Sequence, residues 1–280
     1  LAVMVWIYGG GFSMGTSSSY DGAALAREGV VLVTINYRVG NLGYFAHPAL
    51  SAENAEKVSG NYGILDQIAA LQWVKENIAK FGGDPEKVTI FGESAGGISV
   101  SMLCASPLAK GLFRGAISQS GSSFGPFGPK SYPGENMRAL ADAEKEGVEF
   151  GESKGATTAE ALRALTPQEL NGRFQVTGGP WPIVDGYVIP DDQYKMYEAG
   201  NYNDVALLIG YNADEGDSFG ATDDPVQHVA AVRERYEDYA DKLLAVYPLE
   251  DGKVSKSARD LMRDSAFGWG TWVWGRLQNE

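Results

Sequence analysis

The stretch VTIFGESAGGISV, residues 88–100, decides how this chain folds. Apolar and β-branched residues run up to Gly92, and small and apolar residues with helical spacing follow Ser94. This order predicts a strand, a sharp turn and a helix, the arrangement that presents a serine hydroxyl as a nucleophile above a sheet. The N-terminus of that helix would also favour negative charge that develops beside Ser94.

The same G-x-S-x-G pattern occurs at five serines, so the flanking sequence has to decide between them. A strand-like run directly before the first glycine and a helix-like run directly after the serine occur only at Ser94. A nucleophilic serine of this kind requires that junction. We therefore interpret Ser94 as the nucleophile. The others, which we interpret as turn serines, are Ser13, Ser123, Ser153 and Ser218.

The composition is that of one large globular domain. With 280 residues, of which 44% are hydrophobic, we expect residues 1–280 to form a single, partial α/β domain. The net charge of −13 and the pI near 4.7 argue against nucleic acids and anionic membranes as partners. The longest apolar runs, such as residues 30–33, are too short to span a bilayer. The one cysteine, Cys104, excludes an internal disulfide, and we expect it to be a small core residue.

Strand-like and helix-like segments alternate along the chain, which predicts a mostly parallel sheet flanked by helices. Both ends of the chain fall inside such segments, so we expect a fold that is incomplete at both termini, and the cellular location stays open. The expected strands, apolar enough to be buried on both faces, are residues 1–8, 30–37, 88–91, 112–118 and 205–211. The expected helices are residues 21–28, 64–80, 139–150, 158–165 and an amphipathic helix within 225–247.

A loop made only of glycine, Gly9-Gly10-Gly11, follows the first predicted strand. It has neither the lysine of a phosphate-binding P-loop nor the G-x-G-x-x-G of a dinucleotide fold. Acyl transfer needs two or three amides aimed at the developing oxyanion, and glycine lets the backbone approach that closely. We therefore predict that the amides of Gly10, Gly11 and Ala95 form an oxyanion hole rather than an ordinary glycine turn.

A nucleophilic serine also needs a base, and the base needs an orienting acid. Three acids, Asp214, Glu215 and Asp217, directly follow the fifth predicted strand. An acid at this place suits the chain order serine, acid, histidine. The residues alone do not choose between the three, and a solvated acidic turn remains the alternative.

The chain has two histidines, and neither fits this order well. His47 precedes Pro48 in a loop ahead of the nucleophile. His228 follows the acids, but it falls in the predicted amphipathic helix, so we interpret it as a surface or packing histidine. We expect the base to lie beyond residue 280. The alternative, that His228 completes the triad, stays open.

Eight short motifs, in this order along the chain, resemble those of the type-B carboxylesterases. This α/β-hydrolase family includes cholinesterases and bacterial para-nitrobenzyl esterases, so the resemblance implies an α/β-hydrolase fold for nearly the whole chain. The motifs are YGGGF (8–12), NYRVG (36–40), GNYGILDQ (60–67), FGGDP (81–85), GESAGG (92–97), QSGS (119–122), PIVDG (182–186) and NADEG (212–216).

The resemblance implies roles for the same residues. The acid of the family falls on Glu215, and its oxyanion hole falls on Gly10, Gly11 and Ala95. The family's histidine comes well after the acid and past a further strand, which agrees with a base beyond residue 280.

The resemblance also implies neighbours of the triad. Glu93 matches an acid that borders the pocket and the histidine, and Ser120 matches a serine close to the triad. Phe127 aligns with an aromatic residue of the acyl pocket. Arg38 and Asp66 resemble a buried ion pair, whose loss would cost roughly 3–5 kcal/mol.

Together these expectations describe a serine hydrolase that cleaves small-molecule carboxylic esters through an acyl-enzyme on Ser94, with no metal or organic cofactor. The alternative is a catalytically inactive esterase-like domain that serves in binding or adhesion. The natural ester and the oligomeric state stay open. Aromatic residues that could line a gorge, but that are at least as often core, are Phe12, Phe124, Phe127, Trp181 and Phe219.

Overall fold

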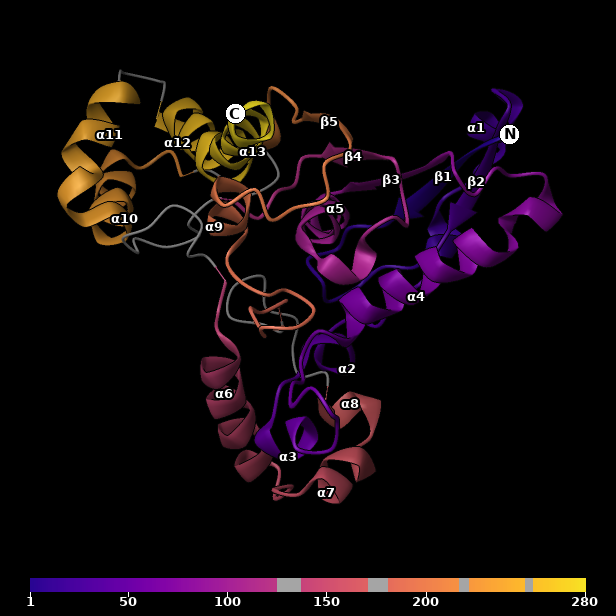
Figure 1. The fold of residues 1–280 in the computed structure, drawn as a ribbon. Helices are drawn as coiled ribbons and strands as arrows, with labels where there is room; N and C mark the ends of the chain where they lie inside the picture. Colours follow the sequence, from indigo (N-terminus) through magenta and orange to yellow (C-terminus); the bar gives the residue numbers. More distant parts are fainter. Residues whose placement is uncertain (125–136, 171–180, 217–221, 250–253) are drawn as a thin grey trace.

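The computed structural model describes residues 1–124, 137–170, 181–216, 222–249 and 254–280 (Figure 1). Within these residues, five strands form one sheet in the order β2-β1-β3-β4-β5, and every neighbouring pair is parallel. The five strands expected from the sequence are therefore confirmed, with different boundaries. They are β1 Ala2–Ile7, β2 Val30–Thr34, β3 Val88–Glu93, β4 Gly115–Gln119 and β5 Ala206–Gly210.

The register brings the carboxyl ends of the strands to one edge of the sheet. Ile7 pairs with Gly92, Glu93 pairs with Gln119, and Gln119 pairs with Gly210. The segments that follow β1, β3, β4 and β5 consequently start side by side. Open parallel sheets bind their ligands at this edge.

One face of the sheet carries the main core. Val5, Ile7 and Ile90 are fully buried, as expected for alternate residues of strands that share a covered face. Helix α5, Ala95–Ala105, lies against β1, β3 and β4, and all of its residues are buried. Cys104 is part of this helix, so the expected core position is confirmed, and burial raises the pKa of its thiol.

The expectation that all five strands are buried on both faces is wrong for β5. Leu207 and Ile209 pack against the core, but Leu208, between them, is 64% exposed. In the described sheet, β5 is an edge strand with β4 as its neighbour. Its apolar run therefore reflects one covered face rather than two.

The expected helices are present, with one break. The predicted helix over residues 225–247 is interrupted at Glu237, whose φ of 44° ends one helix before the next begins. Among the described residues, no helix combines the length and the apolarity needed to cross a bilayer. The α-helices are α1 Ala23–Arg27, α2 Asn41–Tyr44, α3 Pro48–Ser51, α4 Tyr62–Asn77, α5, α6 Leu140–Ser153, α7 Ala159–Ala164, α8 Pro167–Leu170, α9 Gln193–Glu198, α10 Pro225–Tyr236, α11 Ala240–Val246, α12 Val254–Arg263 and α13 Trp269–Asn279. Further helical segments include 3-10 turns at Ser17–Ser19, Ile78–Phe81, Pro107–Ala109 and Glu237–Tyr239, and the π-helix η6 at Asp264–Gly268.

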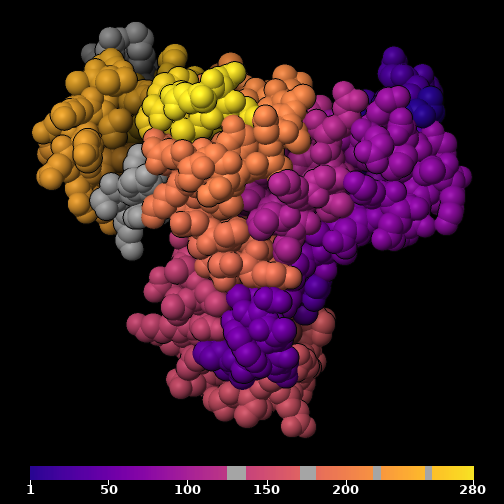
Figure 2. Space-filling view, viewed as in Figure 1, coloured from indigo at the N-terminus to yellow at the C-terminus, as the bar shows by residue number. Residues whose placement is uncertain are grey.

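Two helical parts project from the sheet (Figures 1 and 2). We name the part with α3, α6, α7 and α8 the arm, and the part with α10, α11 and α12 the lobe. Segments far apart in the sequence meet in the arm: the Ser51 hydroxyl donates to Glu144 Oε1 at 2.5 Å, and Arg163 pairs with Glu53 at 2.5 Å. Helix α13 connects the lobe to the sheet.

The Arg38–Asp66 pair forms but is not buried. Arg38 Nε and Nη2 donate to the two Asp66 oxygens at 2.8 and 2.7 Å, and the side chains are 51% and 26% exposed. An ion pair this exposed contributes about 0–1 kcal/mol to the free energy of unfolding. The expectation of a buried pair is therefore wrong, and with it the expected loss of roughly 3–5 kcal/mol. The pair lies at the surface because Arg38 is in the loop after β2.

Candidate active site

Ser94 occupies a strained turn between β3 and α5. Its backbone angles, φ 54° and ψ −122°, lie in a region that residues other than glycine rarely adopt. Ser94 N donates to the Gln119 carbonyl at 2.9 Å, and the Ser94 carbonyl accepts from Ile98 N at 2.9 Å. These bonds fix the bend while the residue stays partly exposed. The strand, the turn and the helix lie where the sequence predicts them.

Glycines permit this turn because other backbone passes directly against it. A Cβ atom at Gly96 would collide with the Ile7 carbonyl oxygen, and one at Gly121 would collide with the Ser94 carbonyl oxygen. A side chain at either position would push α5 away from the sheet or open the turn. The N-terminus of α5 therefore reaches the carboxyl edge of the sheet only because these two residues are glycine.

The glycine loop after β1 passes beside the Ser94 turn. A Cβ atom at Gly9 would lie 2.7 Å from the Glu93 carbonyl oxygen and 3.0 Å from Ser94 Cβ. Gly10 and Gly11 have φ values of 112° and 59°, which favour glycine. A Cβ at Gly11 would meet no atom of the described residues within 4 Å, so that side of the loop is open among them. The loop thus lies within contact distance of the predicted nucleophile.

Two contacts that sequence reasoning missed hold the loop at its ends. Before the loop, Tyr8 Oη donates to the Tyr37 carbonyl at 3.0 Å, and Tyr37 Oη donates to the Tyr8 carbonyl at 2.6 Å. Burial raises the pKa of Tyr37, so its hydroxyl stays a donor. After the loop, the buried Phe12 ring packs edge-on against Trp181 at a centroid distance of 4.7 Å. Tyr8 and Tyr37 each lie in a family motif, YGGGF and NYRVG, but neither motif indicates that the two residues bond to each other.

The aromatic residues considered for a gorge are mainly core. Phe12 and Phe124 are fully buried in the main cluster, and Trp181 packs against it. Phe127, the expected acyl-pocket residue, and Phe219 lie outside the described residues. The side chains that the structure describes therefore indicate no acyl preference.

Glu215 lies beside the end of β4, in the segment that follows β5. Its Oε1 accepts a hydrogen bond from Ser120 Oγ and another from Asn212 N at 2.9 Å. Ser120 is itself held by its own N–H, which donates to the Gly210 carbonyl at 2.8 Å. Both donors bind one oxygen, which leaves Oε2 as the oxygen that can accept from a base. The structure thus joins Glu215 to Ser120.

The other two candidate acids differ from Glu215. Asp214 is exposed at the surface of the same turn, and Asp217 lies outside the described residues. An exposed carboxylate with no fixed geometry is a poor orienting group for a base.

The charge of Glu215 acts on Glu93, the residue that precedes Ser94. Glu93 ends β3, and a Cβ atom at Gly9 would lie 2.9 Å from Glu93 Oε2. Partial burial, followed by the charge of Glu215, raises the pKa of the Glu93 carboxyl. Two carboxyl groups and one serine therefore meet at the carboxyl edge of the sheet, where a cationic group between them would be stabilised.

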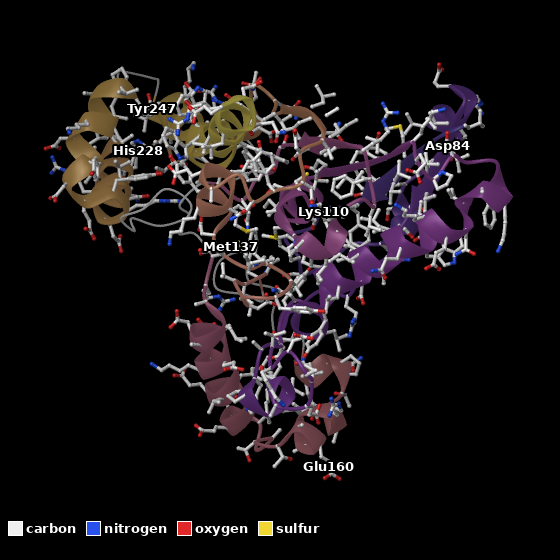
Figure 3. The ribbon with its side chains drawn as sticks, in the orientation of Figure 1. Asp84, Lys110, Met137, Glu160, His228 and Tyr247 are labelled. Carbon is white, nitrogen blue, oxygen red and sulfur yellow. The ribbon has the colours of Figure 1, made fainter. Side chains whose placement is uncertain are left out.

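His228 does not reach this edge. It lies on α10 in the lobe, away from the turn between β3 and α5 (Figures 1 and 3). Only 5% of the residue is exposed, so the expectation of a surface histidine is wrong and a packing role fits. In the part of the chain that the structure describes, its Nε2 has no hydrogen-bond partner, and burial lowers its pKa.

His47 belongs to the arm. It is buried, and its Nδ1 accepts from Ala49 N at 3.0 Å, which caps the N-terminus of α3. Its ring stacks on Phe45 at a centroid distance of 6.1 Å. Its position is therefore explained by the packing of the arm, and neither histidine of the chain lies at the Ser94 turn.

Three other G-x-S-x-G serines, Ser13, Ser123 and Ser153, lack the strained junction found at Ser94. Ser13 Oγ donates to the Gly11 carbonyl at 3.2 Å, and Ser123 is buried against Ser101. Ser153 is the last residue of α6, so its assignment to a turn is wrong. Ser218 lies outside the described residues.

Known proteins resemble this chain in sequence and in fold. The family model described as "Carboxylesterase family" matches residues 1–271. Fumonisin B1 esterase of Sphingopyxis macrogoltabida is 41% identical over 280 residues, which is 95% of this chain and 50% of that protein. Cholinesterase 1 of Branchiostoma lanceolatum is 42% identical over 228 residues, covering 76% of this chain and 62% of its own length.

Among solved structures, a PNB esterase superposes with a TM-score of 0.79 at 34% sequence identity. The match covers 99% of this chain and 60% of that one. The chain thus spans between half and two thirds of the length of these three relatives.

Proposed function

The chain belongs to the carboxylesterase family and has the α/β-hydrolase fold, and on that basis we propose that it supplies the nucleophile, the acid and the oxyanion hole of a serine hydrolase that cleaves carboxylic esters. The proposal takes its reaction class from the family. It takes its residues from the site at the carboxyl edge of the sheet.

In the first half of the proposed reaction, Ser94 Oγ attacks the ester carbonyl carbon and loses its proton to a base. The tetrahedral intermediate then breaks its bond to the alcohol oxygen, which leaves with that proton. The acyl group remains on Ser94. In the second half, water attacks the acyl-enzyme, the base takes a proton from the water, and the carboxylic acid leaves as Ser94 Oγ regains its proton.

The amides of Gly10, Gly11 and Ala95 stabilise the oxyanion in this scheme. Ala95 is the first residue of α5, and the first N–H groups of a helix have no partner within the helix. The position of Gly9, where an added Cβ would lie 3.0 Å from Ser94 Cβ, and the open side of Gly11 support a loop that can reach the same oxygen. One such donor contributes on the order of 10²–10³ in turnover.

We assign the proton transfers to a histidine outside residues 1–280, because His47 and His228 both lie away from Ser94. Glu215 orients this histidine through Oε2 and stabilises it as imidazolium. Ser120 and Asn212 N hold the carboxylate in place, and Glu93 adds a second negative charge near the imidazolium. Phe127 remains a proposed acyl-pocket residue.

The observation that carries the proposal is the Ser94 backbone. A non-glycine residue at φ 54° and ψ −122° costs of order 1–3 kcal/mol. Packing maintains that strain here, and it presents the serine between the glycine loop and a helix N-terminus. A plain connection between a strand and a helix would not need it.

Labelling with a fluorophosphonate probe tests the proposal. In the protein encoded by the full gene, Ser94 Oγ is expected to displace fluoride, so that mass spectrometry finds the phosphonyl group on the Ser94 peptide. Ser94→Ala is expected to remove both labelling and the hydrolysis of a short-chain nitrophenyl ester.

Ser153→Ala is the matched control, because Ser153 has the same flanking pattern but is exposed on α6. This variant is expected to be labelled by the probe and to hydrolyse the nitrophenyl ester as the wild type does. A folded wild-type protein in which Ser94 resists the probe would contradict the proposal and support the inactive binding domain instead.

A further inference from the structure

We propose that Arg263 is a positioning residue for Glu215, because it ties the segment that carries this carboxylate to the end of α12. The inference rests on the proposed role of Glu215 as the acid that orients the base. It adds a residue that lies on a different element and that no motif of the sequence points to.

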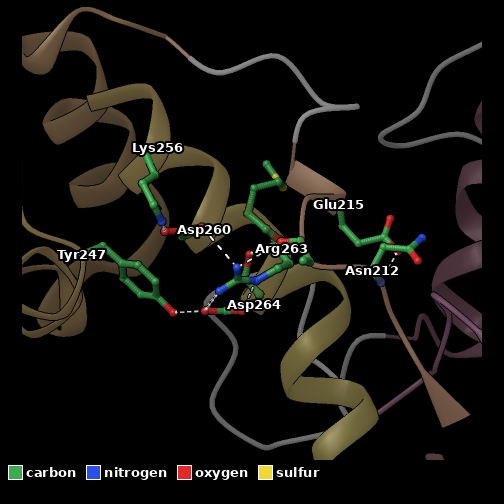
Figure 4. A network of polar contacts seen from close by, with 10 residues as sticks. Asn212, Glu215, Tyr247, Lys256, Asp260, Arg263 and Asp264 are labelled. Carbon is green, nitrogen blue, oxygen red and sulfur yellow. Dashed lines mark hydrogen bonds and ion pairs between the residues drawn. The ribbon is translucent and has the colours of Figure 1, made fainter. Parts of the chain in front are cut away.

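The segment 211–216 is docked against the C-terminal helices at several places (Figure 4). Arg263 Nη1 donates to the Ala213 carbonyl at 3.2 Å, two residues before Glu215. A Cβ atom at Gly216 would collide with the Arg259 carbonyl oxygen of α12. These contacts lie on both sides of Glu215, so the placement of α12 decides where the carboxylate is held.

The Arg263 guanidinium is itself fixed by two acids. Its Nε and Nη2 donate to the two oxygens of Asp264 at 2.7 and 3.0 Å, and its Nη1 also donates to Asp260 at 3.2 Å. Only 25% of the side chain is exposed. A bidentate pair of this kind holds the planar guanidinium in one orientation. In that orientation Nη1 points at the Ala213 carbonyl and donates to it.

The position of this pair in the helix is unusual. Neighbouring residues of a regular α-helix do not face each other, yet Arg263 and Asp264 pair where α12 passes into the π-helix η6. Asp264 also accepts from Tyr247 Oη at 2.7 Å, which anchors it to the segment after α11. π-Helical turns occur frequently at functional sites. Here the turn aligns the pair beside the Glu215 segment.

The consequence for catalysis follows from the two donors on Glu215 Oε1. Asn212 N belongs to the same segment as Glu215, whereas Ser120 belongs to the end of β4. If the segment moves, the carboxylate can keep one donor only by losing the other, and Oε2 turns away from the base. A misplacement of about 1 Å can cost on the order of 10²-fold in rate.

The experiment compares Arg263→Met and Arg263→Lys with the control Arg233→Met. The methionine removes all four hydrogen bonds of the guanidinium. The lysine keeps the charge but cannot serve Asp264 and Ala213 together. The control removes an exposed ion pair with Asp241 within the lobe, away from the Glu215 segment. All variants are made in the protein encoded by the full gene.

Two readouts are measured. In hydrogen exchange, the peptide that covers residues 211–216 is expected to exchange roughly tenfold faster in Arg263→Met, because Asn212 N loses its fixed acceptor. In ester hydrolysis, kcat is expected to fall about 10- to 100-fold with KM within about twofold. The acidic limb of the pH profile of kcat/KM is expected to move to lower pH, because a displaced carboxylate stabilises the imidazolium less. The lysine variant is expected to be intermediate, and the control to match the wild type in both readouts.

The outcomes separate this inference from the proposed function. Wild-type exchange and a wild-type pH profile in Arg263→Met would overturn the role of Arg263, even where Ser94 labels and the ester is hydrolysed. Faster exchange in a protein without any turnover would support the positioning role and count against the esterase proposal. If Arg263→Met does not fold, the lysine variant decides the question by the same two readouts.

Discussion

At the scale of single residues, the site combines a strained backbone at Ser94 with two carboxyl groups, Glu93 and Glu215, that are held differently. Ser94 keeps its positive φ because its N–H donates to the Gln119 carbonyl and its own carbonyl accepts from Ile98 N. Glu93 and Glu215 lie close enough for the charge of one to raise the pKa of the other, but only Glu215 has two donors on one oxygen. A carboxylate held in this way is suited to orient a base, whereas Glu93 is held less firmly.

Glu93 is expected to make stability depend on pH. Its carboxyl pKa is raised in the folded protein, so its ionisation favours unfolding. The stabilising contribution of protonated Glu93 is fully present below the ordinary pKa of Glu and is lost as the pH rises through the raised value. Glu93→Gln is therefore expected to have a higher Tm than the wild type at pH 7, with no difference near pH 4.

Thermal unfolding followed by circular dichroism from pH 4 to 8 checks this expectation. Glu149→Gln is the control, because Glu149 is exposed on α6, in the arm and away from Glu215. It is expected to stay within about 1 °C of the wild type throughout. A Glu93→Gln variant that is less stable than the wild type at pH 7 would show that this carboxylate is stabilised in the fold.

At the scale of elements, the crossing of α5 over the sheet decides where the nucleophile lies. The helix approaches β1 so closely that Gly96 touches the end of Ile7, and all of the helix is buried. Helix α13 packs on the same sheet at β5 with more room, since a Cβ at Gly275 would lie 3.4 Å from Ile209 Cδ1. A side chain in place of glycine is therefore tolerated at this position of α13 but not at Gly96 of α5.

The same substitution is expected to have opposite effects at these two glycines. Gly96→Ala forces α5 off β1 and is expected to destabilise the protein by about 1–3 kcal/mol, because overpacked backbone cannot relax. Gly275→Ala adds a methyl group at an ordinary contact distance and is expected to stabilise by about 0.5–1 kcal/mol, because glycine is a poor helix former. Urea unfolding measures both. Equal effects at the two positions would contradict the close crossing of α5.

At the scale of the whole molecule, α13 links the lobe to the sheet. Trp274 is fully buried in the main core, where its ring stacks on Phe124 at a centroid distance of 5.6 Å. Its Nε1 donates to Tyr197 Oη at 3.0 Å. Trp272, two residues away, is 55% exposed and lies under the Arg276 guanidinium. One face of α13 therefore holds the lobe to the sheet, in addition to the contacts of α12 with segment 211–216.

Trp274→Ala is expected to destabilise the protein by about 3–5 kcal/mol, because it leaves a large cavity and an unpaired Tyr197 hydroxyl. Trp272→Ala is expected to cost no more than about 1 kcal/mol, because it removes a surface contact. Guanidinium unfolding of both variants provides the comparison. A similar small loss in each would mean that Trp274 does not join α13 to the core.

Sequence alone determined the class of fold and singled out Ser94, because both depend on local order. Alternating apolar runs predicted the five parallel strands, and the flanks of Ser94 distinguished it from four other serines with the same pattern. The motifs of a known family indicated Glu215 and Ser120. Their roles in catalysis stay proposals that the labelling experiment begins to test.

Only the tertiary structure decided the contacts between distant segments. Ser120 and Glu215 are 95 residues apart, and Arg263 and Ala213 are 50 apart. The exposure of Arg38, the burial of His228 and the two hydrogen bonds between Tyr8 and Tyr37 also depend on which surfaces pack together. A local pattern fixes the backbone of a strand or a helix. It does not fix the hydrogen-bond partner of a side chain, because that partner is set by how the elements pack against one another.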